Sequence, residues 1–211
     1  MYTPKHFAET RVAVLHDLMR AHPLAALVTQ TAGGLVCDHV PLLIRPGASG
    51  AGTLIGHVAR ANPVWRDFDP GRDVLAIFQG PAAYIPPAWY PTKAETGRVV
   101  PTWNYAVVHA RGRMRAIEDR AWLRAQVDAL TTHMESPRKQ PWGVGDAPAD
   151  YIETLLGAIV GVEIEITDVQ GKWKLNQNKS AADRAGMIEG LAAEGHAAMA
   201  ELTRERSGGK D

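Results

Sequence analysis

The stretch that decides the fold is Ala25-Ala26-Leu27-Val28-Thr29, which leads into Thr31-Ala32-Gly33-Gly34 and a second Val- and Leu-rich segment over residues 35–44. Two apolar segments around a Gly-Gly connection predict a β-hairpin. Similar patterns predict further strands at residues 53–58, 74–78, 102–117 and 159–169. Helices are predicted at residues 10–21, 120–134 and 151–156, with a last helix beginning at residue 180.

This order of elements indicates a mainly β protein with flanking helices. Short consecutive strands with Gly-rich turns are typical of a barrel or a sandwich. Regular alternation of strands and helices is missing, and the sequence has no GxGxxG pattern, so a Rossmann fold is not expected. Length predicts one domain over residues 1–206, which includes the N-terminal and C-terminal helices, followed by a disordered tail at 207–211.

Composition and charge exclude several classes of protein. No apolar run approaches the length of a membrane-spanning helix, and the N-terminus has no apolar signal segment, so we expect a cytoplasmic protein. The single cysteine, Cys37, excludes an intramolecular disulfide. Lys plus Arg and Asp plus Glu are both 23, which gives a formal charge of zero. DNA is therefore a possible partner without support from bulk charge, and we find no helix-turn-helix motif.

Catalytic and metal motifs are missing from the sequence. The 8 histidines show no HExxH pattern and no metal-ligand spacing, so we predict no metal site. His39, His57 and His109 fall on predicted strands, where they are either ordinary polar residues or neighbours of a cofactor. There is no GxSxG motif, and Cys37 lies in an apolar strand as a small residue. We assign no catalytic residue.

The block Gly56-His57-Val58-Ala59-Arg60-Ala61-Asn62-Pro63 is more informative. A strand ends here, an arginine follows, and a helix begins with Asn62 as N-cap and Pro63 at the first helical position. An exposed arginine beside the N–H groups of a helix start suits a phosphate. The alternative is a solvated arginine beside a simple capped turn.

A second polar block spans residues 171–179, where Trp173 lies among three lysines and three amide side chains. Such a surface could stack on a planar ring and bind anionic groups. The alternative is a lysine-rich loop that Trp173 anchors in the core.

Residues 81–105 contain five prolines and five aromatic residues. The prolines predict that no regular central strand forms there. A long aromatic segment of this kind is too apolar to face water, and Tyr and Trp are enriched in interface cores. We therefore predict a homodimer.

Four blocks in order resemble one known family. They are Met1-Tyr2-Thr3-Pro4-Lys5-His6-Phe7, the block at 56–63, Pro101-Thr102-Trp103-Asn104-Tyr105 with Val108-His109, and Lys172-Trp173-Lys174-Leu175 with Gln177-Asn178-Lys179. Together they resemble the PaiB-type FMN-binding negative transcriptional regulators over almost the whole chain, to about residue 190. Asn176 stands where the family pattern has a serine, which makes it a poor site candidate.

The resemblance implies an antiparallel six-stranded split β-barrel, similar to the pyridoxamine phosphate oxidases. It also implies a homodimer with FMN at the dimer interface. The cofactor-binding residues that it implies come from either subunit and are His57, Arg60, Asn62, Trp103, Asn104, Lys174 and Gln177.

The function implied is an FMN-binding regulatory or sensor protein. The alternative is a flavin-dependent oxidoreductase acting on a small molecule, and the sequence leaves open whether the protein is an enzyme. A haem-binding split barrel with a histidine ligand, or a barrel without a ligand, are further alternatives.

Overall fold

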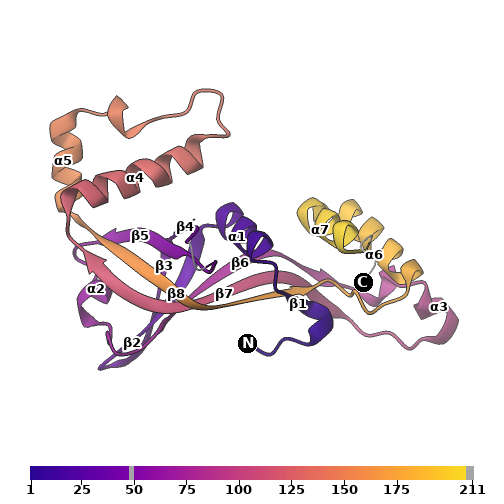
Figure 1. The fold of residues 1–211 in the computed structure, drawn as a ribbon. Helices are drawn as coiled ribbons and strands as arrows, with labels where there is room; N and C mark the ends of the chain where they lie inside the picture. Colours follow the sequence, from indigo (N-terminus) through magenta and orange to yellow (C-terminus); the bar gives the residue numbers. More distant parts are fainter. Residues whose placement is uncertain (48–49, 208–211) are drawn as a thin grey trace. The chain divides into compact units, whose positions relative to one another are not determined.

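The computed structural model describes residues 1–47 and 50–207 (Figure 1). Within them, eight strands form one sheet in the order β3-β2-β6-β7-β8-β5-β4, and β1 pairs with β8. The strands are β1 Ala8–Glu9, β2 Leu24–Thr31, β3 Gly34–Pro41, β4 Leu43–Arg45, β5 Thr53–Ala59, β6 Val74–Ile85, β7 Thr102–Ile117 and β8 Ile159–Lys174. The helices are α1 Val12–Ala21, α2 Val64–Asp67, α3 Thr92–Thr96, α4 Arg120–Glu135, α5 Ala149–Gly157, α6 Ala181–Ala193 and α7 Ala197–Ser207. None of these helices is long and apolar enough to cross a membrane.

The chain divides into two compact units. The central unit comprises His16–Phe78 and His109–Val169, and the terminal unit comprises Met1–Leu15, Gln79–Val108 and the chain from Gln170 onward. The single domain over residues 1–206 stays a prediction. Of the expected tail at 207–211, Ser207 is the last residue of α7, and residues 208–211 lie outside the described part of the chain.

In the central unit, the predicted hairpin is confirmed. β2 and β3 pair from Leu24 opposite Pro41 to Thr31 opposite Gly34, which has a φ of 115° that glycine adopts readily. The second apolar segment is not one strand, however. The N–H of Leu42 still bonds to the carbonyl of Pro23, next to the first residue of β2, and from Leu43 the chain changes partner and pairs as β4 with β5.

Close backbone contacts hold the long strands of the central unit together. The bounds of β7 agree with the prediction, and Gly112 lies within this strand. Its role in the structure is a close approach: a Cβ at Gly112 would lie 2.1 Å from the carbonyl oxygen of Glu165 on β8. Only glycine fits there without a shift of the backbone.

Between β7 and β8 the chain forms a helical segment, residues 118–158, which we call the helical excursion (Figure 1). Asp119 caps α4 by accepting a hydrogen bond from the Trp122 N–H at 2.7 Å. The excursion has a small core of its own, formed by Leu123, Val144, Ile152 and Leu156. The helices predicted at residues 120–134 and 151–156 are thus confirmed.

In the terminal unit, β6 continues through Pro81, although prolines were predicted to exclude a regular strand there. The pairing of β6 with β2 covers Leu75 to Ile77 and does not reach the proline. Past Ile77 that edge is not bonded to β2, so the missing N–H of Pro81 costs no hydrogen bond to that strand.

The sequence predicted one last helix, but the structure has two, α6 and α7. α6 follows Ser180, where the last helix was predicted to begin, and Ser180 caps it by accepting a hydrogen bond from the N–H of Asp183 at 3.1 Å. α6 ends because Gly195 has a left-handed φ of 83°, and His196 then bonds back to the carbonyl of Leu191.

Candidate functional site: the Arg60 cluster

The block at residues 56–63 joins β5 to α2 in the central unit. Asn62 accepts a hydrogen bond from the N–H of Val64 at 2.9 Å and donates one to Asp38 at 2.8 Å. Asn62 thus makes a hydrogen bond of the predicted kind, but the structure has Pro63 at the N-cap, and α2 begins at Val64 and has only four residues. The side chain of Asn62 fixes the turn that follows Arg60.

Arg60 is held from within the central unit. Its Nε donates to the carbonyl of Gly157 at 3.0 Å, and its Nη2 donates to the carbonyl of Ile159 at 3.2 Å. Its Nη1 donates to the carboxylate of Glu118 at 2.5 Å. The side chains of Arg60 and Glu118 are 39% and 58% exposed, so this ion pair faces solvent. The inner edge of the guanidinium is thus fixed by the main chain, and its outer edge faces an exposed carboxylate.

A tryptophan and a second arginine complete this cluster. The indole of Trp65 donates to the carbonyl of Arg60 at 3.0 Å. The guanidinium carbons of Arg60 and Arg66 lie 5.8 and 5.3 Å from its ring centroid. Within residues 1–47 and 50–207, Arg66 forms no ion pair. We call Arg60, Trp65 and Arg66 the Arg60 cluster. Sequence reasoning missed Trp65 and Arg66, which stand five and six positions after Arg60.

His57 contacts the helical excursion. Its Nδ1 lies 2.7 Å from the Oε1 of Gln126 on α4. Gln126 is buried, and its Nε2 has no hydrogen-bond partner among the described residues. An amide nitrogen left without a partner in the interior is unfavourable, so this contact is incompletely satisfied.

The other four predicted cofactor-binding residues lie in the terminal unit; they are Trp103, Asn104, Lys174 and Gln177. Lys174 donates to the Oγ1 of Thr102 and, at 2.8 Å, to the carbonyl of Trp103. Burial lowers the pKa of Lys174, and the neighbouring charge of Lys172 lowers it further. Both ammonium groups lie over the ring of Tyr105, at 5.4 Å for Lys172 and 6.0 Å for Lys174.

Two exposed rings extend this surface. Trp103 is 57% exposed, and its ring contacts the exposed ring of Tyr84 edge-on, with 6.0 Å between centroids. We call this surface the aromatic–lysine face; its members are Tyr84, Trp103, Tyr105, Lys172 and Lys174. It combines flat rings with two cations.

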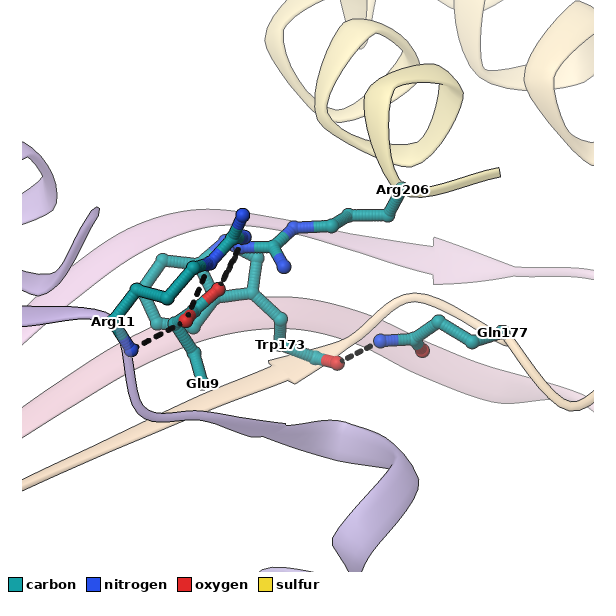
Figure 2. A network of polar contacts seen from close by, with 5 residues as sticks. All are labelled: Glu9, Arg11, Trp173, Gln177 and Arg206. Carbon is teal, nitrogen blue, oxygen red and sulfur yellow. Dashed lines mark hydrogen bonds and ion pairs between the residues drawn. The ribbon is translucent and has the colours of Figure 1, made fainter. Parts of the chain in front are cut away.

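Asn104 and Gln177 serve the interior of the terminal unit. Asn104 is fully buried and donates to the sulfur of Met187 at 3.2 Å, while its Oδ1 has no partner in the described part of the chain. Gln177 accepts from the Leu175 N–H at 2.9 Å and donates to the carbonyl of Trp173 at 2.6 Å (Figure 2). Neither amide side chain projects freely from the surface.

Trp173 is buried, so it anchors the lysine-rich segment in the core. The guanidinium of Arg206 lies 5.6 Å from its ring centroid and also pairs with Glu9, which Arg11 binds from the other side (Figure 2). Burial alone raises the pKa of Glu9, but the hydrogen bonds from both arginines outweigh it and lower that pKa to about 2. This network joins α7 to the N-terminal segment.

The Arg60 cluster fits the groups that a flavin mononucleotide presents. A phosphate dianion suits guanidinium groups, which can bind it with two parallel charge-assisted hydrogen bonds. Each terminal nitrogen of Arg60 carries a second N–H, and no partner for it lies within the described residues. Nowhere in those residues do three or more His, Cys, Asp or Glu side chains gather as metal ligands.

Comparison with known proteins identifies the family. A family model described as "Putative FMN-binding domain" matches residues 1–168. The chain belongs to this family. Protease synthase and sporulation protein PAI 2 of Bacillus subtilis is 32% identical over 209 residues, which cover 98% of each chain. An uncharacterised protein of Aspergillus fumigatus is 34% identical over 259 residues, which cover 100% of this chain and 99% of the relative. The resemblance to PaiB-type proteins is confirmed.

Solved structures support the fold of this FMN-binding-domain family member. The flavocytochrome Anf3 of Azotobacter vinelandii matches with a TM-score of 0.58 and 15% identity, over 82% of this chain and 72% of that one. The FAD and heme binding protein of Mycobacterium smegmatis matches with a TM-score of 0.55 and 17% identity, over 89% and 80%. The predicted antiparallel split-barrel fold is thus confirmed, with eight strands rather than six in the described residues.

Proposed function

We propose that the protein binds FMN and that Arg60 and Arg66 hold its phosphate. The observation that carries this proposal is the set of hydrogen-bond partners of the Arg60 guanidinium. Two main-chain carbonyls fix its inner edge, and its outer edge is paired only with the exposed carboxylate of Glu118. A cation that is already oriented loses little side-chain freedom when it binds an anion.

The other residues of this block and of the Arg60 cluster have supporting roles. Asn62 fixes the turn after Arg60, and His57 lies on the strand that leads to it. Trp65 offers an indole face beside both guanidinium groups. When bound, FMN supplies the capacity for hydride and electron transfer, and the protein positions it and sets its surroundings.

The aromatic–lysine face is the rival position for the cofactor. Trp103 and Lys174 present a ring and a cation there, whereas Asn104 and Gln177 form interior contacts. All four stay predicted cofactor-binding residues that complete the FMN pocket from either subunit, and the experiment below distinguishes the two positions for the phosphate.

The function that we infer is regulatory or sensory and operates as a homodimer. The Bacillus relative is named for protease synthesis and sporulation, and both sequences match over almost their full length. Exposed Tyr84 and Trp103 support a partner surface, because single large aromatics of this kind are enriched at interfaces. Sustained NADH or NADPH consumption with an artificial acceptor would instead favour a flavin-dependent oxidoreductase.

The test is titration of the full-length protein with FMN and with riboflavin, which lacks the phosphate, followed by the quenching of flavin fluorescence. We expect Arg66→Ala to weaken FMN binding by roughly 3- to 20-fold and to leave riboflavin binding unchanged. Arg138→Ala is the matched control, because Arg138 is an exposed arginine paired with Glu135. If Lys174→Ala weakens FMN binding selectively and Arg66→Ala does not, the phosphate lies on the aromatic–lysine face.

A further inference from the structure

The helical excursion joins the sheet at two junctions. We call the junction after β7, at Glu118, the outgoing root, and the junction before β8, at residues 157–159, the returning root. Arg60 bonds to both. Glu118 follows the last residue of β7, and its carboxylate pairs with Arg60 at the outgoing root. At the returning root, the carbonyls of Gly157 and Ile159 accept from the Arg60 side chain, and the carbonyl of Ala158 accepts from its backbone N–H at 2.8 Å. One side chain therefore joins the two ends of a segment that is 41 residues long by its bounds, 118–158.

Three further contacts seat α4 on the rest of the central unit. The Nε2 of His133 lies 2.8 Å from the carbonyl oxygen of Arg20, and the other two contacts involve Trp122 and His57. A Cβ at Gly161 of β8 would lie 2.3 Å from the ring of Trp122, so the helix sits directly on the strand. His57 meets Gln126 at 2.7 Å, with the amide nitrogen of Gln126 left without a partner among the described residues. The excursion also has its own small core. A segment with its own core can shift as one body when one of its attachments is released.

The bonds that Arg60 makes to the two roots differ in strength. The bonds from Arg60 to the returning root involve main-chain carbonyls, whereas the bond to Glu118 is a solvent-facing ion pair. Exposed ion pairs contribute little to stability. A phosphate dianion carries more charge than a carboxylate and can accept two parallel bonds from a guanidinium. It would therefore displace Glu118 more readily than it would displace the carbonyls.

We propose that Arg60 is an exchangeable clamp on the helical excursion: a phosphomonoester that binds Arg60 replaces Glu118 and releases the outgoing root, so α4 and α5 respond to occupancy. This inference rests on the proposed function, because it takes FMN as that phosphomonoester. It gives a sensor protein a movable surface whose state depends on the cofactor. Glu118 is in this account a positioning residue that competes with the ligand.

The test is hydrogen exchange of the full-length protein, measured by mass spectrometry without ligand, with saturating FMN and with saturating riboflavin. We expect FMN to speed exchange of the amides at residues 118–124, and riboflavin to leave them unchanged. Glu118→Gln removes the competing charge, so the ligand-free variant should exchange like FMN-bound wild type at these amides. It should also bind FMN about 2- to 5-fold more tightly, the fold-change that corresponds to an exposed ion pair.

Glu153→Gln is the matched control. It removes the same charge from the same excursion, at an exposed carboxylate 4.0 Å from Arg120. We expect it to change neither the exchange pattern nor the affinity for FMN. If FMN binds but exchange at 118–124 stays constant, or if both variants behave alike, the clamp is overturned and the proposed function stands. If FMN does not bind at all, both proposals fail together.

Discussion

Replacing Arg60 with alanine tests the proposed phosphate site most severely. In the structure this side chain makes two bonds to carbonyls and one ion pair with Glu118. Binding of a phosphate replaces the ion pair, whose contribution is about 0.2–1 kcal/mol, with charge-assisted bonds that contribute about 1.5–3 kcal/mol. The net loss expected for Arg60→Ala is therefore about 0.5–2.8 kcal/mol, or roughly 2- to 110-fold in the FMN dissociation constant.

The assay must separate this loss from damage to the fold. Arg60→Ala also removes the bonds to Gly157 and Ile159, so we expect the variant to be less stable to urea by about 1–3 kcal/mol. Riboflavin binding is the internal control, because a distorted pocket would weaken both ligands whereas loss of a phosphate contact weakens FMN alone. Arg60→Lys keeps the charge without the planar fork and should recover only part of the affinity.

The reasoning is refuted if Arg60→Ala binds FMN as tightly as wild type, or if it loses FMN and riboflavin to the same degree. In the first case the phosphate does not contact Arg60. In the second case the arginine supports the pocket only through its bonds to the returning root of the excursion. Lys172 and Lys174 would then be the next candidates.

Three further predictions concern assembly and stability. Sedimentation at micromolar concentration should give a homodimer of about twice 22.9 kDa, and a clean monomer would contradict the interface proposed for the exposed aromatics. Gly161→Ala should destabilise the protein to urea by about 1–3 kcal/mol, because its Cβ would meet the ring of Trp122 at 2.3 Å; Gly145→Ala, with open space around it, should not. The pKa of Glu9 is about 2 in the folded protein against an ordinary 4.5, so its contribution of about 3 kcal/mol is present above pH 4.5 and is lost as the pH falls toward 2. Glu9→Gln should make urea stability less dependent on pH in that window, and an unchanged slope would show that this ion network does not stabilise the fold.

Local patterns predicted the elements whose formation depends on neighbouring residues. The hairpin around Gly33 and Gly34, the bounds of β7 and the capping of α6 by Ser180 all follow from short-range chemistry. The strand through Pro81 could not be predicted in this way, because it depends on where pairing with β2 ends. The division of the last helix into α6 and α7 could be predicted only in part, because glycine permits the left-handed conformation at Gly195 without requiring it.

At the candidate site, too, local sequence patterns did not predict contacts between residues that are far apart in the chain. The sequence pointed to Arg60 as a phosphate ligand through its place after a strand, yet its partners lie far along the chain. The carbonyl of Gly157 is 97 positions away, and Glu118 is 58 positions away. No local pattern contains such contacts. The left-handed φ of 58° at Asn176 is a conformation that asparagine tolerates better than most residues.

Whether this chain binds FMN can be read from the visible absorption spectrum of the freshly purified full-length protein. We expect flavin absorption bands, or their appearance on titration with FMN to saturation at one flavin per chain. Mass spectrometry of the released cofactor should identify FMN rather than FAD. A protein that shows no flavin bands and binds no added FMN, or one that carries the Soret band of haem instead, would show that FMN is not its cofactor.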